Sequence, residues 1–168
     1  DPPQEKNKRW IGINQEKANA YVGFFLAEGL LPRLFGPVAS LKREVKLGGS
    51  RLDFLVNDRD YLEVKTPLRD IPCEGHPSYE KSPSKFTGYE RLVKHFRDIS
   101  SLKGGARAVV LLCYMYDAPP FTVPEPRERA IVEAARKATA GGVEHWQANL
   151  ELDEAGVGLT RYFRLELF

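Results

Sequence analysis

Cysteine is scarce in this sequence: only Cys73 and Cys113 carry a thiol among 168 residues. So small a number excludes a disulfide-stabilised scaffold, and we expect a reducing intracellular location, the cytoplasm or an organelle. Long apolar runs are also missing. The longest, AVVLLCYMY at 108–116, falls well short of the roughly 18–20 residues that a membrane span needs, so we expect no membrane partner.

The sequence also lacks an initiating methionine and an apolar signal segment in its first residues, DPPQEKNKRW. We therefore expect a processed or shortened piece of a longer protein. A strong excess of one charge is missing too, because the net charge is +2 and the pI about 8.5. This balance permits a nucleic-acid partner without arguing for one, and it leaves the oligomeric state open, a homodimer included.

What is present is an ordinary globular composition, 42% hydrophobic and 29% charged, in a length that suits one domain. We expect an irregular lead-in at 1–12 and a single α/β domain at 13–168. Leu68 and Ile71 mark one further short strand, and 32–37 reads as a connector. The hydrophobic periodicity predicts the order αβββ(β)αβαββ. The expected helices are at about 15–29, 87–101 and 127–140, and the expected strands at about 40–47, 50–56, 61–66, 106–116, 143–152 and 158–167.

The stretch SRLDFLVNDRDYLEVKT places two carboxylates and a lysine in a predicted β-hairpin. Side chains alternate along a strand, so Glu63 and Lys65 share one face. Asp53 joins them if the hairpin pairs it with either residue, which requires a three-residue loop at 57–59 or 58–60. A two-residue turn instead places Asp53 opposite Val64, on the other face, unless a bulge intervenes.

If these side chains converge, Asp53 and Glu63 offer the oxygen ligands that Mg²⁺ or Mn²⁺ prefers, and Lys65 adds a positive group beside the ion. Such a combination is what metal-dependent phosphodiester hydrolysis requires. Glu28 is a fourth candidate, an acid on an otherwise apolar helix face. The plainer alternatives are a surface ion pair for Glu63 and Lys65, and the polar last residue of a helix for Glu28.

The spacing from Asp53 to Glu63-x-Lys65 resembles the signature of the PD-(D/E)xK nuclease superfamily, whose core has the order αβββαβ. The wider sequence resembles the sugar fermentation stimulation protein A family. Members of that family look like a small N-terminal barrel followed by a nuclease-like domain, and they are described as DNA-binding. The matching segments extend from Arg9 to Glu144 and read RWIGIN, AN, REVKLGGSRLDFLV, YLEVKT, ERLVKHF, RAVVLL and GVE.

By this resemblance, Asp53, Glu63 and Lys65 take the catalytic roles. The implied metal ligands are Asp53, Glu63, the backbone carbonyl of Val64 and Glu28, and the implied DNA contacts are Arg51, Arg91, Lys94 and His95. Two features depart from the family. The barrel is missing, and the segment before and within ERLVKHF has Tyr89 and Leu92 where the family has Thr and Gly.

The resemblance predicts a DNA-binding protein with a Mg²⁺- or Mn²⁺-dependent nuclease site on a restriction-endonuclease-like mixed sheet flanked by helices. The alternative is a DNA-binding or regulatory protein that keeps the acids without turnover. A third class, a structural interaction module, leaves the acids uncoordinated and the basic face of helix 87–101 simply solvated.

Overall fold

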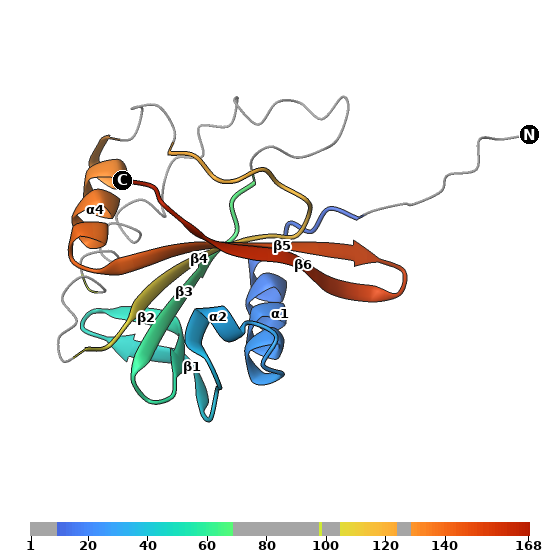
Figure 1. Ribbon diagram of the computed structural model, residues 1–168, viewed down its shortest axis with the longest axis horizontal. Helices are drawn as coiled ribbons and strands as arrows, with labels where there is room; N and C mark the ends of the chain where they lie inside the picture. The colour runs from blue at the N-terminus through green and yellow to red at the C-terminus, as the bar shows by residue number, and fades with distance from the viewer. Residues whose placement is uncertain (1–9, 69–97, 99–104, 124–128) are drawn as a thin grey trace, which may run out of the picture.

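The computed structural model describes residues 10–68, 98, 105–123 and 129–168, and these build a mixed α/β fold around one six-stranded sheet. The strands lie in chain order across the sheet, from β1 at one edge to β6 at the other (Figure 1). Their bounds are Leu41–Leu47 (β1), Ser50–Val56 (β2), Asp60–Lys65 (β3), Ala108–Tyr114 (β4), Val143–Asp153 (β5) and Gly156–Leu165 (β6).

Strand direction divides the sheet into three parts. The β1–β2–β3 meander is antiparallel, β3, β4 and β5 run parallel, and β5–β6 is an antiparallel hairpin. All seven residues of β4 are buried. A near-continuous apolar strand of this kind is typical of the centre of a parallel sheet that is covered on both faces.

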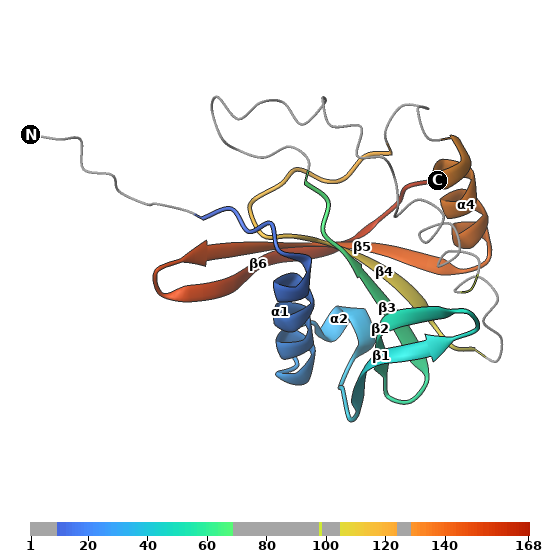
Figure 2. The same cartoon turned by 180° about the vertical axis from the view of Figure 1, so that it is seen from behind.

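Helices cover the two faces separately. Helices α1 (Gln15–Ala27) and α2 (Pro32–Phe35) pack on a core that includes Phe54, Val64 and Leu111. Helix α4 (Arg129–Ala140) packs on a second core that includes Val110 and Leu112. Residues 110, 111 and 112 alternate between the two cores, as side chains on a strand must. In both views α4 lies away from α1 and α2 (Figures 1 and 2).

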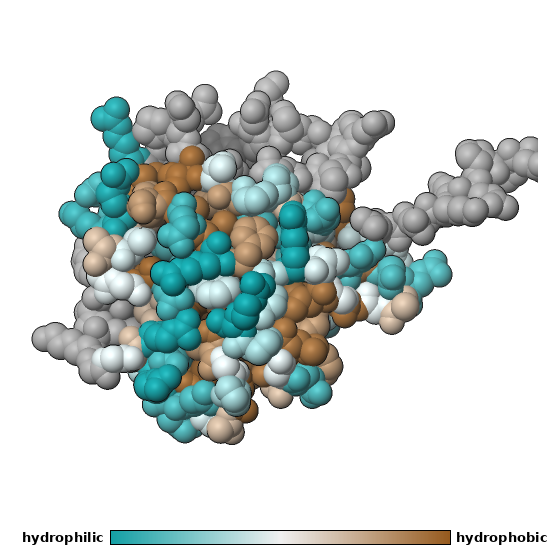
Figure 3. All heavy atoms as spheres, in the orientation of Figure 1, coloured by the Kyte–Doolittle hydropathy of each residue, from teal (hydrophilic) through white to brown (hydrophobic). Residues whose placement is uncertain are grey.

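The outer surface mixes polar and apolar side chains, as the space-filling view of one face shows (Figure 3). Among the described residues, the large apolar side chains that are most exposed are Trp10, Ile13, Phe24, Leu30 and Phe168. In the described parts of the chain, no helix is long and apolar enough to cross a membrane.

The order of elements agrees with the sequence pattern wherever the structure describes it, and two details differ. The connector at 32–37 contains α2, which begins at Pro32 and is closed by Gly36 with a φ of 68°. Leu68 lies outside any strand, and Ile71 is not among the described residues. Of the predicted helix at 87–101, only Asp98 is described, and it is helical.

The lead-in is not wholly irregular. Trp10 bridges to Leu152 and Gly12 bridges to Met115, both through antiparallel backbone pairing. A side chain at Gly12 would lie 2.6 Å from the Cβ of Met115, which is too close for any residue but glycine. The start of the described chain therefore pairs with the carboxyl-terminal ends of β4 and β5.

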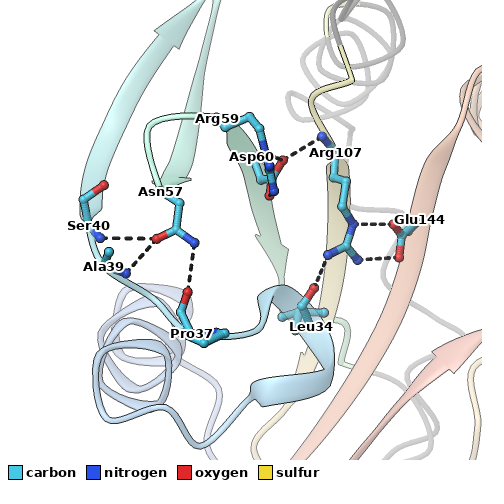
Figure 4. Close-up of polar contacts among 9 residues, drawn as sticks. All are labelled: Leu34, Pro37, Ala39, Ser40, Asn57, Arg59, Asp60, Arg107 and Glu144. Atoms are coloured by element: carbon cyan, nitrogen blue, oxygen red, sulfur yellow. Dashed lines mark hydrogen bonds and ion pairs between the residues drawn. The ribbon is translucent and has the colours of Figure 1, made fainter.

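Polar contacts hold the loop end of the sheet together (Figure 4). The Arg107 guanidinium donates two hydrogen bonds to Glu144, at 2.8 and 2.9 Å, and one to the carbonyl of Leu34, at 2.6 Å. Its backbone N–H donates to buried Asp60 at 2.9 Å. Burial raises the pKa of Asp60, but hydrogen bonds from Arg59 and Arg107 outweigh it and leave that pKa lowered. One arginine thus joins β3, β4, β5 and α2.

Candidate active site

The β2–β3 register shows which loop joins the two strands. Val56 pairs with Asp60, Leu55 with Tyr61 and Phe54 with Leu62, which leaves 57–59 as the loop. Continued by one residue, this register would align Asp53 with Glu63, but the backbone pairing stops at Phe54 and Leu62. Of the alternatives left open by the sequence, the structure therefore has the first three-residue loop. Two residues of that loop, Asn57 and Asp58, adopt positive φ angles of 54° and 53°.

The Asp53 carboxylate is held by two donors from different elements. The backbone N–H of Val64 on β3 donates to Asp53 Oδ2 at 2.7 Å. The side-chain amide of Asn19 on α1 donates to Asp53 Oδ1 at 2.7 Å. Backbone pairing between β2 and β3 ends at Phe54 and Leu62. Beyond that point the Asp53 carboxylate, and not a backbone carbonyl of β2, accepts the hydrogen bond from the Val64 N–H.

The regular alternation of side chains between the two faces of the sheet is interrupted at Asp53. Leu52 belongs to the core beneath α4 and Phe54 to the core beneath α1, whereas side chains two apart on a regular strand share a face. Across from Asp53, Glu44 has a positive φ of 53°, and it is the one β1 residue between Leu41 and Leu47 without a partner in the β2 register. This local twist accompanies the turning of the Asp53 carboxylate toward β3.

Glu63 and Lys65 form a partly buried ion pair on β3. The Lys65 ammonium lies 2.5 Å from Glu63 Oε1, and the side chains are 27% and 4% exposed. An exposed pair of this type contributes little to stability and requires no special explanation. Because Glu63 is almost fully buried, the surface-pair alternative does not describe it.

Electrostatics link Asp53 to both residues. Burial raises the pKa of Asp53, and the negative charge of Glu63 raises it further. The Val64 N–H, the charge of Lys65 and the Asn19 amide lower it by less, so the pKa stays above 3.8. Two carboxylates held this close favour a bound proton or cation between them.

Glu28 is not brought to this group. It is the exposed C-cap of α1, nine residues beyond Asn19, which is about 13 Å along a helix at about 1.5 Å per residue. Among the described residues, no group of three His, Cys, Asp or Glu side chains gathers where it could hold a metal ion. The carboxylates that the structure brings together are therefore Asp53 and Glu63.

The predicted DNA contacts are only partly described. Arg51 projects from β2 with a side chain that is 60% exposed, 3.4 Å from Glu44. Arg91, Lys94 and His95 lie outside the described residues.

Two contacts of the fold are not apparent from the spacing of residues, although a matching sequence segment contains a partner of each. Asn19 lies in the short AN match and contacts Asp53 from 34 residues away. Arg107 and Glu144 begin and end the RAVVLL and GVE matches, and they form the bidentate pair that joins β4 to β5. In neither case does local spacing show that the two residues meet.

Comparison with known proteins places the chain in a family. The model of the "Sugar fermentation stimulation protein RE domain" matches residues 16–156. The chain belongs to this family. Its sequence is 30% identical to a sugar fermentation stimulation protein homolog of Methylobacterium sp. (strain 4-46) over 158 residues, which are 89% of this chain and 62% of the relative. A homolog of Brucella ovis is 28% identical, over 96% of this chain and 68% of its own length.

A solved structure shows the same fold. The SfsA protein of Pyrococcus furiosus, determined in complex with Ca²⁺, superposes with a TM-score of 0.66 at 23% identity. The match covers 93% of this chain and 66% of that one. The chain thus spans less than two thirds of the Methylobacterium relative and about two thirds of the Pyrococcus protein.

Proposed function

We propose that this domain binds DNA and hydrolyses its phosphodiester bonds with a divalent cation, Mg²⁺ or Mn²⁺, in the manner of PD-(D/E)xK nucleases. The observation that carries the proposal is the convergence of Asp53, Glu63 and Lys65 at the point where β2 turns away from its regular pairing. Two acids and a lysine close together, Asp53 on β2 and Glu63 and Lys65 on the neighbouring β3, are the components of that chemistry.

The residues present fit a hard divalent cation. Mg²⁺ in enzymes is commonly held by one or two carboxylates, with water and substrate phosphate completing its shell. Asp53 and Glu63 supply two carboxylates, and each carboxylate oxygen can accept more than one contact, so the hydrogen bonds to Asp53 do not exclude an ion. The related Pyrococcus protein was determined in complex with Ca²⁺, an ion with the same preference for oxygen.

Each of the three side chains has a distinct role in the proposed reaction. Asp53, oriented by Val64 and Asn19, and the buried Glu63 would hold the cation, which when bound would polarise the phosphate and favour ionisation of the attacking water. Lys65 orients that water or neutralises the charge that grows on the phosphoryl oxygens. The water gives up one proton to solvent as its oxygen bonds to phosphorus, the bond to the leaving ester oxygen breaks, and that oxygen takes up a proton from solvent.

The alternative is a protein that binds DNA without cutting it. The observation in its favour is that the described residues bring two acids together and not three. Turnover, and not the presence of a bound ion, separates the two functions.

The test compares Lys65→Ala and Asp53→Ala with the parent. Calorimetry measures Mn²⁺ binding, and cleavage of plasmid and single-stranded DNA is followed with Mg²⁺, Mn²⁺ or EDTA. We expect Lys65→Ala to bind Mn²⁺ but to lose turnover by about 100-fold or more, because it acts on the transition state. Asp53→Ala should lose both.

Lys42→Ala is the matched control, since Lys42 is an exposed strand lysine that also pairs with a carboxylate, Asp58. It should cut DNA at the parent rate. Cleavage by Lys65→Ala at that same rate would refute the catalytic assignment. A parent that binds Mn²⁺ and DNA but leaves every substrate intact would identify the binding-only alternative.

A further inference from the structure

The side chain of Asn19 has an arrangement that its own hydrogen bonding does not explain. Its Nδ2 donates to Asp53 Oδ1 at 2.7 Å. Its Oδ1 is buried and has no hydrogen-bond partner among the described residues. A buried amide oxygen without a hydrogen-bond donor is unfavourable. Reversing the Asn19 amide, so that Oδ1 and Nδ2 exchange places, would turn this oxygen toward Asp53.

That reversal is excluded whenever Asp53 is ionised, as it must be to bind a cation. An ionised carboxylate only accepts hydrogen bonds, so the group that faces it must be the amide N–H and cannot be the amide oxygen. Holding Asp53 therefore forces Oδ1 of Asn19 into a position without a partner. The contact to Asp53 outweighs that loss, because hydrogen bonds to charged groups are stronger than those between neutral groups.

The contact also completes the orientation of Asp53. The Val64 N–H holds Oδ2 and leaves the carboxylate free to pivot about that single bond. Asn19 holds Oδ1 from the opposite element, α1, so the two contacts together fix the plane of the group. Partners of this kind, one step away from a metal, commonly set ligand orientation and metal affinity.

We propose that Asn19 is the positioning residue of this site: it aligns Asp53 for the cation, in the place where the sequence pattern suggested Glu28. The consequence for the cation rests on the proposed function, whereas the hold on Asp53 does not. Asn19 reaches the site because its position on α1 faces the β2–β3 junction, while Glu28 lies at the other end of the helix.

The first measurement needs no metal. Hydrogen exchange of the Val64 amide, followed by NMR, reports the bond to Asp53 directly. In Asn19→Ala we expect that amide to exchange about tenfold faster relative to the amides of β4, because Asp53 is no longer held in line with it. Gln15→Ala is the matched control: it removes an exposed amide from the same helix and should leave Val64 unchanged. Unchanged protection of Val64 in Asn19→Ala would overturn the proposal.

The second measurement is Mn²⁺ affinity by calorimetry. We expect a loss of about 10- to 100-fold in Asn19→Ala and none in Gln15→Ala. Asn19→Asp keeps an oxygen but loses the donor, so tighter binding in that variant, together with an unchanged Val64, would make residue 19 a direct ligand and refute positioning. If the parent itself binds no Mn²⁺, the proposed function fails, and the exchange of Val64 alone decides the role of Asn19.

Discussion

Asp53 holds a charge that the folded protein disfavours. Burial and the neighbouring Glu63 raise its pKa, so the ionised form is less stable in the folded state than in the unfolded one. Asparagine at this position can keep both contacts, since its oxygen can accept from Val64 and its amide can donate to a reversed Asn19. The charge then disappears without loss of hydrogen bonding.

We therefore expect Asp53→Asn to raise the free energy of unfolding by roughly 1 kcal/mol at neutral pH without metal. The gain should shrink as the pH falls toward 3.8, because the parent Asp53 then becomes protonated in the folded state. Urea unfolding of both proteins across that range measures it. A gain that grows on acidification would contradict the raised pKa.

His145 makes the opposite contribution to acid stability. Burial lowers its pKa from 6.5 to about 4. The Thr139 hydroxyl donates to the carbonyl of Ala135, so the 2.9 Å contact to His145 is a bond donated by the imidazole Nε2. Between pH 6.5 and 4 the unfolded chain takes up a proton that the folded chain refuses, so stability falls as the pH falls.

The expected loss from this residue is about 3 kcal/mol between neutral pH and pH 4. His145→Gln keeps a donor for Thr139 but does not titrate, so its stability should fall less steeply than that of the parent. Asp60 and Glu144, whose pKa values are lowered, also lose stability on acidification in both proteins, and the comparison cancels them. Equal slopes for the two proteins would refute the role of His145.

At the scale of elements, β1 departs from regular strand geometry opposite the site. Glu44 adopts the left-handed region, where a side chain is disfavoured, and its ion pair with Arg51 is largely exposed. Glu44→Ala loses the pair and keeps the Cβ, whereas Glu44→Gly loses the pair and relieves the backbone.

Glycine should accordingly be more stable than alanine at position 44, by about 1 kcal/mol. Lys46, an exposed residue of the same strand without a positive φ, provides the control: there alanine should be more stable than glycine. Thermal unfolding of the four variants measures both differences. The same order at both positions would contradict the assigned backbone of Glu44.

Sequence reasoning about elements succeeded where the pattern was local. Alternation along 50–56 and 61–66 predicts the hairpin and places Glu63 and Lys65 on one face. The choice between loop lengths was beyond it, because Asn57 is held by contacts to Pro37, Ala39 and Ser40 from an earlier segment. Helix α2 was missed because four residues show no periodicity.

At the scale of the whole molecule, Arg107 joins the parallel strands to the helical layer. It contacts Glu144 on β5, Asp60 on β3 and Leu34 of α2, and its guanidinium lies 5.4 Å from the centre of the Phe35 ring. Its removal leaves Glu144, whose side chain is 15% exposed, without its main partner.

We expect Arg107→Ala to lower the free energy of unfolding by about 3 kcal/mol. Arg164 also approaches Glu144, at 4.0 Å, but its side chain is 56% exposed, so Arg164→Ala should lower it by less than about 1 kcal/mol. Urea unfolding compares the two variants. Similar losses would show that Arg107 acts as an ordinary surface residue.

The sequence by itself determined what depends on neighbours along the chain: the alternating strands, the central apolar strand, and the shared face of Glu63 and Lys65. Only the tertiary structure decided which distant residues meet. Asn19 rather than Glu28 reaches Asp53, and Arg107 meets Glu144 across 37 residues. The reason is physical. Side-chain alternation is a property of the strand backbone itself. The angle at which a helix packs on a sheet, and which of its residues contact that sheet, depend on how the whole core is filled.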